Sequence, residues 1–130
     1  MNIAYLSCAL LALLLFSLSL TVSMTRLRQQ RGYGNEPDPT NWLTKIVRAQ
    51  ANASEYVPTL IALIIILELM GSPGWTSWVM LLAVASRYLH AAGMLLSPDL
   101  SNPHPLRFIG SAGTYTCGFL LTIQVIYGAL

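Results

Sequence analysis

Apolar residues form four long runs along this chain, separated by three short polar segments. The runs cover residues 3–24, 57–70, 75–96 and 106–130, and a polar extension lengthens the second run back to Asn41. With that extension, each run is close to the ~20 residues that a membrane-spanning helix needs. Because a spanning segment must satisfy its own backbone hydrogen bonds, helices are the expected structure. The pattern predicts an all-α, transmembrane four-helix bundle, with residues 1–130 forming a single membrane domain.

The first polar segment has the residues of a loop and of a helix start. Residues 32–41 contain Gly, Asn, Asp and two prolines, which is typical of turns. Thr40 or Asn41 is the expected N-cap of a helix that begins near Trp42. Pro58 lies inside that helix, so we expect a kink or local unwinding there.

Composition supports a membrane protein and excludes several other classes. Hydrophobic residues make up 55% of the chain and charged residues only 9%, whereas about a quarter of the residues in a soluble domain are charged. The first run lacks a basic n-region, which favours a retained helix over a signal peptide. Cys8 and Cys117 lie inside apolar runs, and no Cys/His spacing indicates a metal site. A net charge of +2 gives no reason to expect nucleic acid as a partner.

The basic residues are distributed unevenly among the loops. Arg26, Arg28, Arg31, Lys45 and Arg48 lie in or beside the first loop, and Arg107 follows the third loop, residues 97–105. The second loop, residues 71–74, carries no charge. By the positive-inside rule, loops one and three face the cytoplasm and both termini lie outside. In a bacterium this would place the protein in the inner membrane.

A polar cluster occupies the start of the second helix. At about 100° per residue, one helix face carries Arg48, Asn52, Glu55, Tyr56 and Thr59. Gln50 points almost the opposite way, so this helix offers polar groups in two directions. Arg can bind carboxylates and Glu can receive an ammonium group, which favours a ligand site. An interhelical polar network that only fixes packing is the alternative.

The third run carries Arg87 and, one turn nearer the cytoplasm, His90. An arginine at that depth in a membrane needs a partner, and we expect Glu55 or an anionic ligand. A single histidine in a helix is more often a hydrogen-bonding residue in packing than a catalyst. The residues alone leave both roles open for His90.

The motif Arg-Ala-Gln-x-Asn-x-x-Glu-Tyr-x-Pro, residues 48–58, resembles the MAPEG family, the membrane-associated proteins of eicosanoid and glutathione metabolism. Arg87 with His90, followed by a proline-rich loop and Arg107, is most similar to its microsomal glutathione transferase and bacterial branches. The resemblance covers essentially the whole chain. It implies a homotrimer that binds glutathione in a cytoplasm-facing cleft between adjacent subunits.

The resemblance also implies roles for individual residues. Glutathione contacts are expected from seven side chains, which are Arg28, Arg48, Gln50, Asn52, Glu55, Tyr56 and His90. Arg87 matches an arginine that the transferases share and is the first candidate for activating the thiol; Arg28 and Arg107 are the other candidates. Two positions depart from the family pattern: Met94 stands where a tyrosine is expected, and Ser101 lies near the place of an activating arginine.

The expected function is that of a membrane-bound glutathione transferase or peroxidase. The thiolate of glutathione would attack a lipophilic electrophile or a lipid hydroperoxide delivered from the membrane lipid. A non-catalytic scaffold of the same family, binding lipid or glutathione, is the first alternative. A small multidrug transporter is the second, although residues 3–24 lack the acidic residue that proton coupling requires.

Overall fold

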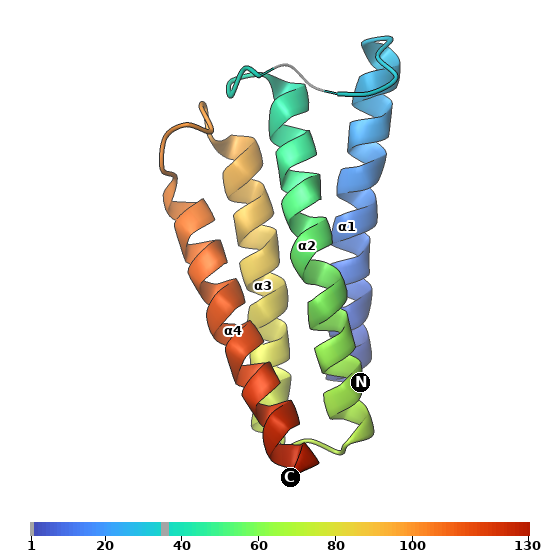
Figure 1. Ribbon diagram of the computed structural model, residues 1–130, viewed down its shortest axis with the longest axis vertical. Helices are drawn as coiled ribbons and strands as arrows, with labels where there is room; N and C mark the ends of the chain where they lie inside the picture. Colours follow the sequence, from blue (N-terminus) through green and yellow to red (C-terminus); the bar gives the residue numbers. More distant parts are fainter. Residues whose placement is uncertain (1, 35–36) are drawn as a thin grey trace.

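The computed structural model describes residues 2–34 and 37–130, and the four predicted helices are all present there. They are α1 (Ile3–Arg28), α2 (Trp42–Leu69), α3 (Trp75–Leu96) and α4 (Pro105–Ala129). The helices run up and down, so both termini lie at one end and the first and third loops at the other (Figure 1). Each is long and apolar enough to cross a membrane. The prediction of an all-α transmembrane bundle is confirmed, and the chain is an integral membrane protein.

The helix ends follow local hydrogen-bonding rules. Asn41 caps α2, because its side chain accepts a hydrogen bond from the Leu43 N–H at 2.8 Å. At the other end of α2, Gly71 has a positive φ of +68°, and the Ser72 N–H donates to the Leu67 carbonyl at 3.1 Å. This is a Schellman ending, in which a glycine adopts the left-handed conformation.

Two expectations about the helices change in detail. α1 continues one turn beyond the apolar run and carries Arg26 and Arg28 in its last turn, where positive charge complements the helix dipole. α2 is helical through Pro58, so the local unwinding expected there is not seen. A proline removes a single hydrogen bond, and neighbouring helices support the backbone around it.

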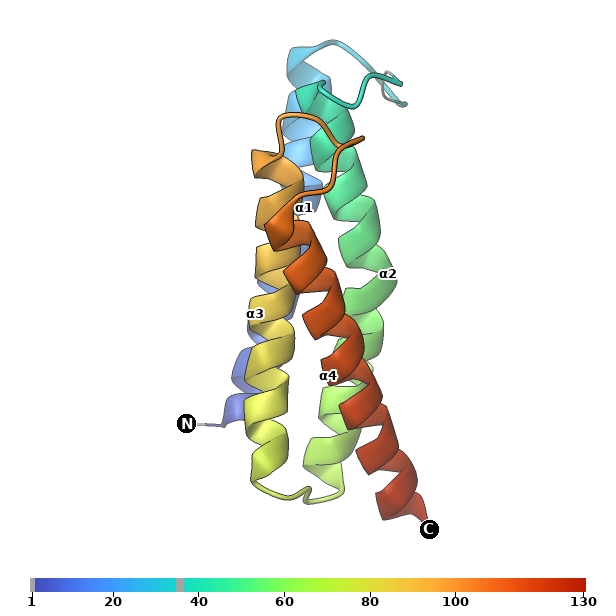
Figure 2. The same cartoon turned by 90° about the vertical axis from the view of Figure 1, so that its left-hand side faces the viewer.

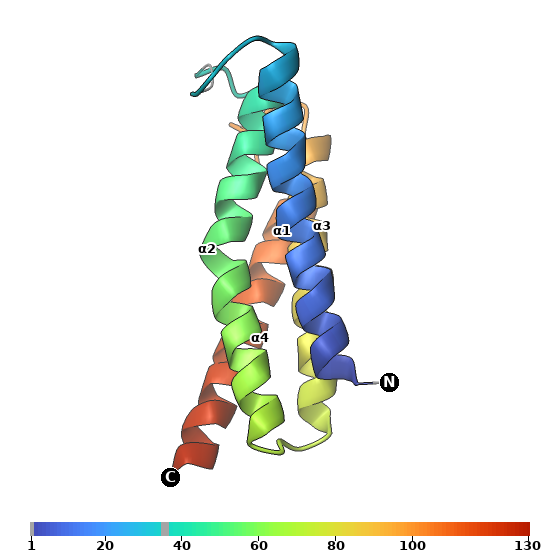
Figure 3. The same cartoon turned by 90° about the vertical axis from the view of Figure 1, so that its right-hand side faces the viewer.

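The bundle is built around α2 and α3. Contacts join α1 to α2 and α3, and join α4 to α3 and α2, while α1 and α4 do not touch within the described residues. α4 crosses the bundle obliquely (Figure 2), and α1 covers the opposite side (Figure 3). Apolar side chains with less than a few per cent exposure fill the space between the helices, including Leu11, Leu43, Val57, Ile64 and Leu121.

Glycines allow α3 and α4 to approach each other closely. A Cβ atom at Gly110 would lie 2.5 Å from the backbone nitrogen of His90, and one at Gly93 would lie 2.6 Å from the backbone nitrogen of Arg107. Small residues commonly permit such contacts between membrane helices. The two glycines therefore bring the backbone of α3 at His90 against α4 and the backbone of α4 at Arg107 against α3.

Loops one and three are joined to each other. The Leu100 N–H donates to the Pro39 carbonyl at 3.2 Å. In the first loop, the Asp38 carboxylate accepts from both the backbone N–H and the hydroxyl of Thr40, each at 2.8 Å. These hydrogen bonds hold the pKa of Asp38 below its usual value.

The close contact of α3 and α4 generates a stability prediction. Gly110→Ala should destabilise the protein by about 1–3 kcal/mol, because the added methyl group forces the two backbones apart. Gly118→Ala is the matched control on the same helix, since a Cβ there meets nothing within 4 Å. Alanine favours a helix over glycine, so this control should be neutral or slightly stabilising. Thermal unfolding in detergent measures both variants. Equal stability of the two would contradict the close packing.

Candidate functional site

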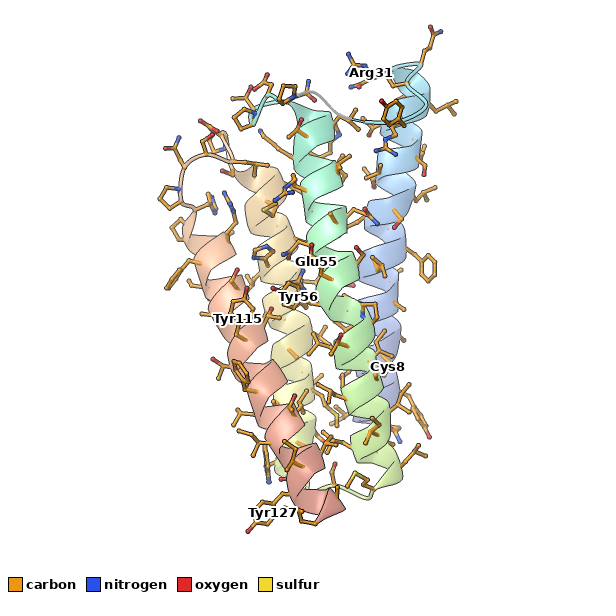
Figure 4. All side chains as sticks on the ribbon, in the orientation of Figure 1. Cys8, Arg31, Glu55, Tyr56, Tyr115 and Tyr127 are labelled. Atoms are coloured by element: carbon orange, nitrogen blue, oxygen red, sulfur yellow. The ribbon has the colours of Figure 1, made fainter. Side chains whose placement is uncertain are left out.

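A polar cavity of about 180 Å³ lies in the half of the bundle nearer loops one and three. α2, α3 and α4 all contribute to its wall. Glu55 lies on the face of α2 that is turned toward α3 and α4 (Figure 4). The side chains that line the cavity are Arg48, Ala51, Asn52 and Glu55 from α2, His90 and Met94 from α3, and Arg107 from α4. The predicted polar face of α2 therefore forms one side of a real cavity.

Arg87 lies behind this cavity rather than in its lining. It is only 1% exposed, and its Nη2 donates to Asn52 Oδ1 at 2.8 Å. Its guanidinium carbon also lies 5.2 Å from the ring centroid of Tyr56, a cation–π distance. Within the described residues, Arg87 Nε is buried without a hydrogen-bond partner. The hydrogen-bonding partner of this arginine is thus Asn52, and Glu55, which the sequence suggested, lines the cavity instead.

Tyr56 links this arginine to α4. Its hydroxyl lies 3.0 Å from the hydroxyl of Tyr115, and the two rings pack edge to face with centroids 5.7 Å apart. Figure 4 shows the two tyrosines facing each other across the space between α2 and α4. Sequence reasoning missed Tyr115. It could have been found, because Arg107, Ser111 and Tyr115 are spaced four residues apart and share one face of α4.

His90 and Arg107 hold the upper part of α4 and the third loop in place. His90 Nδ1 lies 3.0 Å from both the Arg107 carbonyl oxygen and the Ser111 hydroxyl. Arg107 Nη1 donates to the carbonyls of Leu100 and Asn102 at 2.9 and 3.1 Å. His90 is therefore a packing residue that also lines the cavity, and Arg107 fixes the loop above it.

Two of the predicted site residues are not brought to the cavity. Gln50 points toward α1, where its Nε2 lies 3.5 Å from Ser19 Oγ, as the opposite-face prediction requires. Arg28 is exposed at the end of α1. Within one subunit, the structure therefore brings together Arg48, Asn52, Glu55, His90 and Arg107, with Tyr56 and Arg87 beside them.

A second hollow lies between α2 and α4, next to the tyrosine pair. It measures about 170 Å³, and Tyr56 and Tyr115 both line it. Among the described residues, no group of three His, Cys, Asp or Glu side chains could hold a metal ion. The polar groups that line the two hollows include arginine, carboxylate, amide, imidazole and phenol.

A profile of the MAPEG family matches residues 4–127, which include most of every helix. No curated protein matches the chain. The family match spans every residue that lines the polar cavity.

Proposed function

This chain belongs to the MAPEG family, and from that premise we propose that it is a glutathione transferase that also acts as a glutathione peroxidase. The observation that carries the proposal is the polar cavity, where Arg48 and Glu55 on α2 face Arg107 on α4. Glutathione has two carboxylates, an ammonium group and a thiol. Arginine binds carboxylates in a bidentate manner, and a glutamate receives an ammonium group. The cavity thus offers arginine for a carboxylate and glutamate for the ammonium group of this co-substrate.

The size of the cavity supports a site that is completed by a second subunit. Its volume of about 180 Å³ is below the roughly 300 Å³ at which ligand pockets usually begin. Gln50 and Arg28 lie away from the cavity of their own subunit. In the homotrimer expected from the family resemblance, these two residues would reach the glutathione held mainly by the neighbouring subunit.

The proposed mechanism uses arginine to favour the thiolate. A free thiol has a pKa of about 8.5, so glutathione is mostly protonated at neutral pH. Arg107 in the cavity wall would stabilise the thiolate directly. Arg87, which lies outside the cavity lining, would hold Asn52 and Tyr56 in place and would add positive charge close to the thiolate. The thiolate would then attack a lipophilic electrophile or a lipid hydroperoxide that reaches it from the membrane lipid, with proximity lowering the barrier.

A non-catalytic binding protein is the second candidate. The observation that favours it is Met94, which lines the cavity with a thioether where the family resemblance leads us to expect a phenol. A thioether cannot donate a hydrogen bond to a thiolate. Under this reading the protein binds glutathione or lipid without turnover.

The proposed orientation places the cavity on the cytoplasmic side. The bundle brings loops one and three to the same end, and the basic residues of both loops gather there. An excess of Lys and Arg marks cytoplasmic loops. Both termini would then lie outside.

The first prediction concerns glutathione binding. Arg48→Ala and Glu55→Ala should each weaken binding about tenfold to a hundredfold, because each removes one charge-assisted hydrogen bond. Isothermal titration of the purified trimer with glutathione measures the change. Lys45→Ala is the matched control, since it removes a charge from the same helix outside the cavity. If all three variants bind like the parent, the cluster serves packing only.

The second prediction concerns the thiolate. Arg107→Leu should raise the pH at which bound glutathione ionises, and should slow conjugation more at neutral than at alkaline pH. The ultraviolet absorbance of the thiolate, followed against pH, measures the change. Arg87→Leu should give a smaller shift together with weaker binding, because it releases Asn52. If only Arg87→Leu shifts the titration, the buried arginine is the activating residue. If bound glutathione in the parent titrates like the free thiol, the mechanism fails.

The third prediction concerns orientation. Gly32→Cys and Gly74→Cys replace two exposed glycines whose Cβ positions meet nothing within 4 Å. In intact cells, an impermeant thiol reagent should label position 74 and leave position 32 unlabelled, after correction for the parent protein. Labelling of position 32 alone would reverse the orientation and place the cavity outside.

A further inference from the structure

The hollow between α2 and α4 continues the site along the bundle axis. The polar cavity ends on α2 at Glu55, and this hollow begins one residue later, at Tyr56. From there it extends toward the other end of the bundle. Its lining beyond the tyrosines is apolar apart from threonine hydroxyls and is formed by Thr59, Leu60, Leu63, Thr114, Gly118, Phe119 and Thr122. We refer to it below as the α2–α4 groove.

The groove has the size and the chemistry for one compact apolar group. Its volume is about 170 Å³, and an apolar cavity of roughly 150 Å³ is known to bind benzene. Tyr56 and Tyr115 place their aromatic hydroxyls in its lining, at the end next to the polar cavity. A ligand in the groove would therefore place its apolar body among the leucines and its polar end at the two phenols.

The two phenols leave one O–H group for a ligand. They lie 3.0 Å apart, and their shared hydrogen bond uses one of their two protons. The Arg87 guanidinium lies over the Tyr56 ring, and a nearby cation makes a phenol the stronger donor. Either hydroxyl could be the donor in this pair, and the nearby cation favours Tyr56, an arrangement in which Tyr115 keeps its own O–H. Tyr115 lines the groove, and the residue is 51% exposed in the single chain.

We propose that the α2–α4 groove binds the apolar group of an organic hydroperoxide and that Tyr115 is the catalytic proton donor for its reduction. This inference rests on the proposed function, because the glutathione thiolate is the reductant. The hydroperoxide is already a substrate under that proposal; the inference goes further by assigning its apolar group to the α2–α4 groove and by giving Tyr115 a role as proton donor.

The proposed reaction balances with two glutathione molecules. The thiolate sulfur of the first attacks the terminal peroxide oxygen, so an S–O bond forms and the O–O bond breaks. The electron pair stays on the inner oxygen, which takes the Tyr115 proton and leaves as an alcohol. The proton released when the thiol ionised returns to the Tyr115 phenolate. The sulfenic acid of the first glutathione then condenses with the thiol of the second, giving a disulfide and water.

Tyr115→Phe tests the proton donor and keeps the ring that packs against Tyr56. We measure turnover of the glutathione-loaded trimer with cumene hydroperoxide and with an activated halonitroarene, whose halide leaves without a proton. The ratio of peroxidase to conjugation turnover should fall about a hundredfold, the usual effect of losing one donor to a developing oxyanion. Tyr127→Phe is the matched control, because it makes the same change on an exposed part of α4 far from the site (Figure 4).

The outcomes separate this inference from the proposed function. A parallel fall of both activities in Tyr115→Phe would show that Tyr115 supports only the shared thiol site, which overturns the inference. A parent that conjugates the halonitroarene but reduces no hydroperoxide also overturns it and removes the peroxidase part of the proposed function, while the transferase part stands. A parent that binds glutathione and performs neither reaction overturns both.

Gly118→Leu tests the groove itself. Gly118 lines the groove, and a Cβ there meets nothing within 4 Å, so a larger side chain can fill the space without meeting backbone. The KM for cumene hydroperoxide should rise about tenfold or more, while the KM for hydrogen peroxide, which has no apolar group, should change far less. An equal change for both peroxides would show that the organic group binds elsewhere.

Discussion

A buried arginine in a membrane bundle must find the equivalent of its hydration shell inside the protein, and the arrangement of three helices here depends on that constraint. Arg87 is almost completely buried on α3. Asn52 and Tyr56 on α2 provide an amide oxygen and an aromatic face, and Tyr115 on α4 extends the contact by one hydrogen bond. Because an unpaired charge at this depth costs several kcal/mol, these contacts fix the levels of α2 and α4 against α3.

The same constraint orders polarity along the bundle. On one side of Tyr56, α2 carries charged and amide side chains, and on the other side residues 57–67 are apolar apart from Thr59. The contact between α3 and α4 at Gly93 and Gly110 aligns with this division, because it brings His90 and Arg107 to the polar side. A polar co-substrate and an apolar substrate would thus meet at one level, at the tyrosine pair.

Much of this could be read from the sequence, and the rest could not for identifiable reasons. Length and hydropathy predicted the four helices, Asn41 marked the start of α2, and the turn of 100° per residue placed Asn52 and Glu55 on one face. Glu55 was one of the partners predicted for Arg87, but the guanidinium is hydrogen-bonded to Asn52 instead. The offset of α2 along the bundle axis relative to α3 decides which of the two side chains meets the guanidinium. That offset comes from packing of whole helices. The four-residue spacing from Arg107 and Ser111 could have marked Tyr115 as part of one face of α4, but its pairing with Tyr56, 59 residues away, depends on the same packing of whole helices.

The backbone of Leu100 makes two hydrogen bonds that together connect the first loop to a side chain of the cavity wall. Its N–H donates to Pro39 in the first loop, and its carbonyl accepts from the Arg107 side chain. One residue therefore ties a cationic side chain of the cavity wall to a loop that begins some sixty positions earlier in the chain. The length of the first loop therefore affects the site. A residue inserted or removed near Pro39 would shift Leu100 and change the direction of the Arg107 guanidinium, although no side chain of the cavity had been altered.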